Sequence, residues 1–124
     1  MSERTVLIVE DESDAAEMFA EMVRIFGLHA VTSLNSPNAL ALVARLQPSL
    51  LILDIMLPEV SGLDLLRSLR VDPRFATLPV ILVSALALPI DVKAGLAAGA
   101  NAYLPKPVAY IELKNTMERL LAIR

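Results

Sequence analysis

The sequence predicts an α/β protein with a single doubly wound sheet of five parallel strands and five helices. Three observations predict this class. Short apolar runs of strand length alternate along the chain with stretches of helical periodicity. Strict alternation is typical of a parallel sheet that helices cover on both faces, and right-handed crossovers restrict its topology. The run at residues 50–53 is apolar throughout, as expected for a strand that is covered on both faces.

Composition limits the classes of protein that fit this chain. With 124 residues, 56% of them hydrophobic, residues 1–124 form one domain with enough apolar surface for a core. The net charge of −3 argues against a direct nucleic-acid contact. The lack of cysteine excludes disulfides and thiolate metal sites. No signal peptide or membrane-spanning run is visible, so we expect a cytoplasmic protein. The mean hydropathy of +0.60 indicates an apolar surface for a partner.

The first half of the chain contains two predicted β-α units. A β-branched run at residues 5–9 predicts the first strand, and Gly27 ends the helix that follows. The apolar side chains of that helix recur at helical spacing: Ala15, Met18, Phe19, Met22, Val23 and Phe26. Residues 29–32 form the second strand. Ser36 as N-cap and Pro37 at the first helical position begin the next helix, which buries Ala39, Leu40, Val43 and Leu46.

The second half contains three more units. The third strand covers residues 50–54, and turn residues at 57–62 lead into a helix that ends at Asp72 and Pro73. The fourth strand, residues 80–83, ends in Ser84, and Pro89 opens a weakly amphipathic helix. Residues 102–104 form a short fifth strand before a proline-rich loop. The last helix buries Leu113, Met117, Leu120 and Leu121.

Polar side chains follow four of these strands. Glu10 and Asp11 end the first strand, Asp54 the third and Ser84 the fourth, and Lys106 follows the fifth. Each has an ordinary explanation alone: a helix cap, a solvated carboxylate, a turn serine or a surface lysine. A flavodoxin-like strand order 2-1-3-4-5, however, places the first and third strands side by side at the switch point. That order brings three carboxylates into one crevice with a hydroxyl and an ammonium beside them.

This set of side chains suits phosphoryl chemistry. Crowded carboxylates repel one another, and a divalent cation relieves the repulsion. A ligand set of oxygen alone favours Mg²⁺ over zinc. Lys106 and Ser84 can hold phosphate oxygens as a point charge and a hydroxyl donor. The residue types therefore fit a carboxylate nucleophile that accepts a phosphoryl group.

At these positions the chain resembles a known family, the receiver domain of two-component response regulators. The resemblance covers essentially the whole chain. Its motifs are Val9-Glu10-Asp11-Glu12, Leu53-Asp54-Ile55-Met56-Leu57-Pro58 with Gly62, Val83-Ser84-Ala85, and Tyr103-Leu104-Pro105-Lys106-Pro107, and Gly95, Gly99 and Ala100 fit the same pattern.

The resemblance implies a phosphorylation switch in place of a conventional enzyme. Asp54 would take the phosphoryl group from a histidine kinase or a histidine phosphotransfer protein, and slow autodephosphorylation would remove it. Asp11, Asp54 and the backbone carbonyl of Met56 would ligate Mg²⁺, with Glu10 acting through water. Ser84 and Lys106 would grip the phosphoryl oxygens.

Further roles follow from the same resemblance. Tyr103 would be the switch aromatic that turns inward as Ser84 moves, and the bond between Lys106 and Pro107 would be cis. Met56 and Leu86 would flank the path of the attacking water and favour a long-lived phosphoryl group. We also expect an apolar surface for a homodimer or an effector on the fourth helix, fifth strand and fifth helix, formed by Ala87, Leu88, Pro89, Ile90 and Tyr103.

Three other functions compete with this one. A haloacid-dehalogenase-type phosphohydrolase would carry its nucleophile on the first strand in an Asp-x-Asp pattern, but Glu12 and Ser13 follow Asp11 here. An electron-transfer flavodoxin would need a Ser/Thr-rich phosphate loop where this chain has acidic residues. A receiver that works as an unphosphorylated scaffold stays open.

Several other residues are interpreted as structural. His29, the one histidine, is expected to be structural or exposed on a short edge strand. Met18, Met22 and Met117 are assigned to the core. Arg67, Arg70 and Arg74 are assigned to a solvated face. The cognate kinase and the output are not determined by the sequence.

Overall fold

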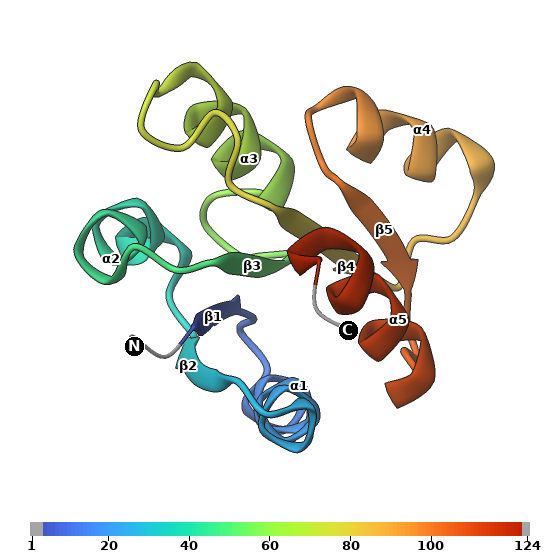
Figure 1. The fold of residues 1–124 in the computed structure, drawn as a ribbon. Coiled ribbons are helices and arrows are strands. Elements are labelled where there is room, and N and C mark those ends of the chain that lie inside the picture. Colours follow the sequence, from blue (N-terminus) through green and yellow to red (C-terminus); the bar gives the residue numbers. More distant parts are fainter. Residues whose placement is uncertain (1–3, 123–124) are drawn as a thin grey trace.

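The structure, a computed structural model, describes residues 4–122 and confirms the predicted fold class (Figure 1). Five parallel strands form one sheet in the order β2-β1-β3-β4-β5. The elements, in chain order, are β1 Thr5–Val9, α1 Ser13–Phe26, β2 His29–Ser33, a 3₁₀ turn Ser36–Asn38, α2 Ala39–Leu46, β3 Leu50–Asp54, α3 Gly62–Val71, β4 Val80–Ser84, α4 Pro89–Ala97, β5 Ala102–Pro105 and α5 Tyr110–Leu121.

The core has two layers because helices cover both faces of the sheet (Figure 1). One layer joins Leu51 and Leu53 of β3 to side chains of α2 and α3, while Leu50 and Ile52 face α1 and α5 on the other side. Consecutive residues of a strand point to opposite faces. Both faces are apolar here, and for this reason the β3 sequence is an unbroken apolar run. No helix in the described range is long and apolar enough to cross a membrane.

Local signals in the sequence account for several helix boundaries. Gly27 ends α1 in the left-handed conformation, with φ of 104°, and its N–H bonds the carbonyls of Arg24 and Val23. The Ser61 hydroxyl caps α3 by accepting from the N–H of Asp64 at 3.2 Å. The start of α2 differs from the prediction: Pro37 lies in the 3₁₀ turn, and Asn38 is the N-cap of α2. The fixed φ of proline is compatible with that tighter turn.

Two predicted core residues, Met18 and Leu40, are exposed. In α1 the sheet-facing residues include Phe19 and Val23, and in α2 they are Ala39 and Val43. Met18 and Leu40 are each one residue from this face, which is roughly 100° around the helix. The prediction identified both helices but set the buried face too wide.

Gly62 fixes the approach of the β3–α3 loop to the end of β3. Its N–H bonds the carbonyl oxygen of Ile55 at 2.8 Å. A Cβ atom at this position would lie 2.2 Å from the carbonyl oxygen of Asp54 and 2.7 Å from the Cα of Ile55. Both are backbone atoms, so neither can move aside without displacing the strand.

We expect Gly62→Ala to destabilise the protein by about 1–3 kcal/mol, as overpacking does, although alanine is the better helix former. Urea unfolding measures the change. Gly27→Ala is the matched control, because nothing lies within 4 Å of its added methyl and its cost of about 1 kcal/mol comes from the left-handed backbone alone. Only Gly62→Ala should also shift the amide resonances of Asp54 and Met56. A Gly62→Ala protein as stable as the wild type would contradict this account.

Candidate functional site

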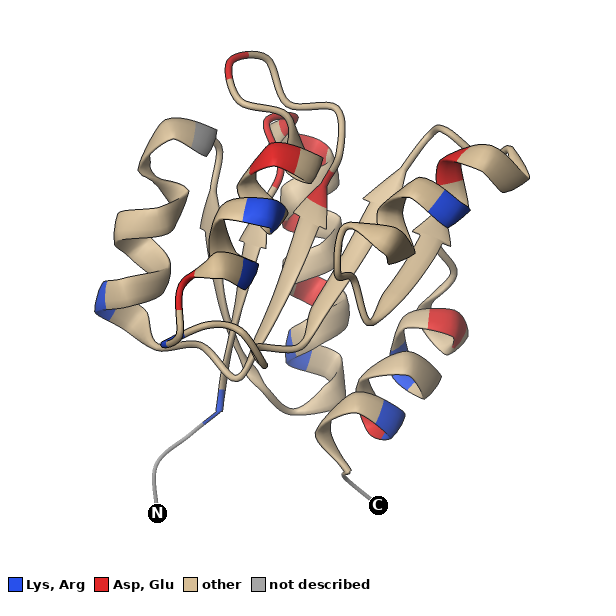
Figure 2. Ribbon diagram, turned by 90° about the horizontal axis from the view of Figure 1, so that it is seen from above, with Lys and Arg blue, Asp and Glu red and all other residues tan. Residues whose placement is uncertain are grey.

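The carboxyl ends of the central strands bring two buried carboxylates together. Strands β1 and β3 are neighbours, and Val9 pairs with Leu53. Glu10 and Asp54, the next residue after each of these, therefore lie side by side at the carboxyl ends of the two strands. Their residues are 1% and 4% exposed. Figure 2 shows acidic segments gathered beyond these strand ends. Two carboxylates this deeply buried need charged or hydrogen-bonding partners.

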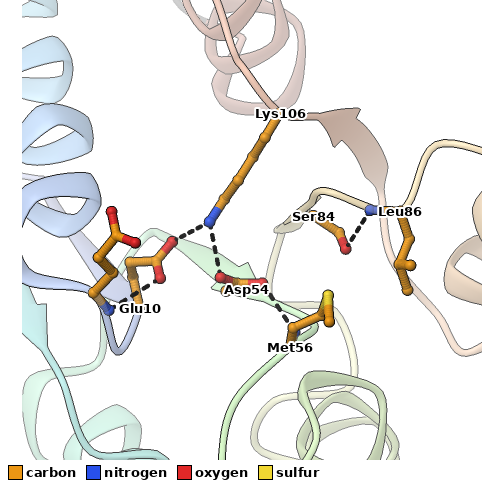
Figure 3. A network of polar contacts seen from close by, with 7 residues as sticks. Glu10, Asp54, Met56, Ser84, Leu86 and Lys106 are labelled. Atoms are coloured by element: carbon orange, nitrogen blue, oxygen red, sulfur yellow. Dashed lines mark hydrogen bonds and ion pairs between the residues drawn. The ribbon is translucent and has the colours of Figure 1, made fainter.

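Lys106 supplies that partner by bridging both carboxylates. Its Nζ atom lies 2.6 Å from Oε1 of Glu10 and 2.9 Å from Oδ2 of Asp54 (Figure 3). The backbone N–H of Lys106 donates to the carbonyl of Ser84 at 2.8 Å, which fixes the base of the side chain at the end of β4. The peptide bond between Lys106 and Pro107 is cis.

Burial and the hydrogen bonds of this bridge shift the pKa values of Glu10 and Lys106. Burial raises the pKa of Glu10, the hydrogen bond from Lys106 opposes that rise, and the neighbouring Asp54 adds to it. Burial alone would lower the pKa of Lys106, but its hydrogen bonds to Glu10 and Asp54 outweigh burial and raise it. Lys106 is therefore a permanent cation at neutral pH.

The second oxygen of Asp54 and the hydroxyl of Ser84 are held by the loops that follow their strands. Oδ1 of Asp54 accepts from the N–H of Met56 at 2.9 Å, and Oγ of Ser84 accepts from the N–H of Leu86 at 3.1 Å. The side chains of Met56 and Leu86 are exposed. Both lie on the Ser84 side of Asp54, away from Glu10 (Figure 3).

Three carboxylates form a candidate cation site. Glu10, Asp11 and Asp54 each offer one oxygen, and these oxygens lie within 4.8 Å of one another. Asp11 is exposed, so this corner of the site is open to water. A set of oxygen donors with room for water fits Mg²⁺.

The structure thus brings together the polar residues predicted from the strand ends. Ser84 follows Val83, which pairs with Asp54 across β3 and β4. Tyr103 on β5 contacts the loop that follows Ser84, because its hydroxyl donates to the carbonyl of Leu86 at 2.7 Å. Burial raises the pKa of Tyr103, so it keeps its proton as a donor.

Two of the assignments made from the sequence, for Tyr103 and Arg70, were wrong, whereas the expected exposure of His29 is confirmed. Tyr103 is 8% exposed, so it does not belong to the apolar surface on which it was placed; α4 covers it. Arg70 does not belong to a solvated face, since its guanidinium bonds the carbonyls of Gly99 and Phe75 and the side chain of Asn101. Two of its acceptors are backbone carbonyls, which a sequence does not mark. His29 is exposed on β2, as expected.

Comparison with known proteins identifies the family. A sequence model described as the response regulator receiver domain matches residues 6–118. The chain is 32% identical over 118 residues to the polar-differentiation response regulator DivK of Brucella anthropi, covering 95% of this chain and 96% of DivK. It is 35% identical over 108 residues to the DNA-binding response regulator MtrA of Mycobacterium tuberculosis, covering 87% of this chain but 46% of MtrA.

Solved structures agree. The receiver domain of the Francisella response regulator 1452 superposes with a TM-score of 0.89 at 27% identity, covering 96% of this chain and 97% of that one. The receiver domain of the sensor histidine kinase PA1611 from Pseudomonas aeruginosa, which has a magnesium ion coordinated in its active site cleft, gives 0.89 at 26% identity, covering 98% of this chain and 99% of that one. The chain belongs to the response regulator receiver domain family of two-component systems.

The ion pairs of Lys106 predict a pH-dependent loss of stability when the lysine is replaced. We expect Lys106→Met to destabilise the protein near neutral pH, by an amount at the lower end of the roughly 3–5 kcal/mol found when one partner of a buried ion pair is removed. The lower end applies because the Lys106 side chain is 26% exposed. The buried Glu10 carboxyl then keeps a pKa raised above its ordinary value of 4.5. A raised carboxyl pKa stabilises the folded protein at low pH, and this contribution is lost as the pH rises through the folded-state value.

Urea unfolding of wild type and Lys106→Met from acid to neutral pH measures this effect. The stability difference should be small in acid and grow toward neutrality. Lys114→Met is the control, because its 3.6 Å pair with Glu118 is on the surface and should contribute little. A pH-independent difference for Lys106→Met would contradict the prediction.

Proposed function

We propose that this chain accepts a phosphoryl group on Asp54 from a histidine kinase or a histidine phosphotransfer protein and acts as a signalling switch. One observation carries the proposal: Asp54 is a buried carboxylate, held by Lys106 and by the N–H of Met56, at the strand end where two other carboxylates gather. A nucleophile needs this kind of fixed orientation.

The proposed transfer uses groups of this chain for orientation. An oxygen of Asp54 bonds to phosphorus while the bond from phosphorus to the donor imidazole nitrogen breaks, and that nitrogen keeps the electron pair. Lys106 and Ser84 hold the phosphoryl oxygens, one as a cation and the other as a hydroxyl donor. Phosphoryl transfer depends mainly on such positioning and on electrostatic stabilisation.

Mg²⁺ is the cation that fits the acidic cluster. Asp11, Asp54 and the backbone carbonyl of Met56 would hold it, with Glu10 acting through water. The oxygen cluster of this chain supports this assignment, as does the magnesium ion coordinated in the cleft of the PA1611 receiver domain. When bound, such a cation supplies charge neutralisation for the phosphoryl oxygens.

The output surface that we propose comprises α4, β5 and α5. Leu88 and Ile90 at the start of α4 are 65% and 73% exposed, and Leu96 and Ile111 are also exposed. Exposed apolar side chains on these elements favour contact with a second copy or an effector. Phosphorylation would change this surface through the loop that joins Ser84 to α4.

The phosphoacceptor assignment is tested by replacing one carboxylate. Asp54→Asn should abolish incorporation of an acid-labile phosphoryl group from acetyl phosphate, measured by intact-protein mass spectrometry, because the amide is a far weaker nucleophile. Asp64→Asn, at an exposed carboxylate on α3, should be phosphorylated like the wild type. Stoichiometric phosphorylation of Asp54→Asn would refute the assignment.

The lifetime of the phosphoryl group is a separate prediction. We propose that Met56 and Leu86 cover the approach of the attacking water, since both side chains lie exposed on the Ser84 side of Asp54 and neither binds water strongly. The double variant Met56→Asn with Leu86→Glu should lose its phosphoryl group several-fold faster, followed by the decay of radiolabelled protein. Ile111→Asn, an exposed apolar position on α5, is the control. An unchanged decay in the double variant would show that another group sets the rate.

A further inference from the structure

Helix α4 is attached to the sheet differently from the other helices. It buries a single residue, Gly95, whereas each of the other α-helices in the described range buries at least one valine or larger apolar side chain. Val92 of α4 is partly buried against the same core, but at Gly95 the backbone of the helix lies directly on side chains of β4 and β5. Figure 1 shows α4 over β5 at the edge of the molecule.

The ring of Tyr103 occupies the space where a side chain of residue 95 would lie. A Cβ on Gly95 would be 2.7 Å from Cδ2 and 3.0 Å from Cε2 of Tyr103, and 2.9 Å from Cδ1 of Leu82. The Leu82 methyl can turn away, but the aromatic ring is rigid and buried. Alanine at position 95 would force the ring or the helix to move.

The far end of the same ring is connected to the site. The Tyr103 hydroxyl donates to the carbonyl of Leu86, and the N–H of Leu86 donates to Oγ of Ser84. Two consecutive hydrogen bonds thus join the tyrosine to the serine hydroxyl at the strand end. The ring therefore packs against the backbone of Gly95 on one side, where no side chain intervenes. At its other end, its hydroxyl bonds the loop that follows Ser84.

We propose that Gly95 is a positioning residue: by leaving room for the buried Tyr103 ring, it holds Leu86 and so orients the Ser84 hydroxyl toward a phosphoryl group on Asp54. This inference rests on the proposed function of Asp54 and deepens it. Binding and conformation are linked reciprocally, so a variant that expels the ring also weakens the hold of Ser84 on the phosphoryl group.

The contact between Gly95 and the buried ring of Tyr103 is tested without phosphorylation. The chain has two tyrosines and no tryptophan, so Tyr110→Phe leaves Tyr103 as its one tyrosine fluorophore. In that background Gly95→Ala should raise acrylamide quenching of Tyr103 at least twofold. Ala94→Gly, at an exposed position of α4, weakens the helix by propensity without adding an atom near the ring, and should leave quenching unchanged. No increase in Gly95→Ala, or equal increases in both variants, would overturn the proposal.

A second variant keeps the test decisive if Gly95→Ala folds poorly. Replacing Tyr103 with leucine removes the rigid ring, so Gly95→Ala combined with Tyr103→Leu should be at least as stable as Tyr103→Leu alone, because alanine is the better helix former. A double variant that is less stable than Tyr103→Leu would show that the ring is not what excludes a side chain at position 95.

The connection to the site is tested with acetyl phosphate. Gly95→Ala and Tyr103→Phe, which keeps the ring but loses the hydroxyl, should each lower the rate of Asp54 phosphorylation several-fold, while Ala94→Gly should not. An exposed ring with an unchanged phosphorylation rate would overturn the proposed link to Ser84. If the wild type itself takes no phosphoryl group, the proposed function fails, and the quenching experiment still decides whether Gly95 seats the ring.

Discussion

The ion pairs of Lys106 with Glu10 and Asp54 are the interaction on which the arrangement of the site depends. The lysine is 96 residues from Glu10 in the sequence, and the contact exists because the strand order places β1 and β3 side by side. Without a cation, two buried carboxylates on neighbouring strands would repel each other. Three carboxylates and one ammonium still leave two negative charges at the site, which is the charge that one divalent cation balances.

Two glycines set distances that no side chain could set. Gly62 lets the β3–α3 loop return onto the carbonyl of Asp54, and Gly95 lets α4 rest on the ring of Tyr103. In both places the absence of a Cβ atom brings backbone into contact with a group that belongs to the site or is connected to it. Close contacts therefore position the loops at the strand ends as much as hydrogen bonds do. Alanine at position 62 or 95 would displace groups of the site although neither residue belongs to it.

Much of the fold and of the candidate site could be predicted because both depend on patterns along the chain. Apolar runs mark the strands, and the strand-order rule brings Asp54, Glu10 and Lys106 together. What the sequence did not reveal depends on phase and on backbone. Met18 is exposed because one residue of rotation moves a side chain off the buried face of a helix. Arg70 and Tyr103 donate hydrogen bonds to backbone carbonyls. Because every residue has a backbone carbonyl, no sequence motif marks the one that accepts the bond.

Helix α4 buries fewer side chains than α5, and the apolar side chains of Leu88 and Ile90 at its start are exposed. Helix α4 buries one glycine and packs Val92 partly against the core, so less apolar packing opposes a shift of α4 than of α5, which buries Leu113 and Met117. A partner that covers Leu88 and Ile90 removes apolar surface from water, which favours binding. Because the same helix rests on Tyr103, whose hydroxyl bonds the loop after Ser84, a partner that binds one position of α4 better than another also favours one arrangement of that loop. By reciprocity, the proposed phosphoryl group held by Ser84 would change the affinity for that partner by the same factor.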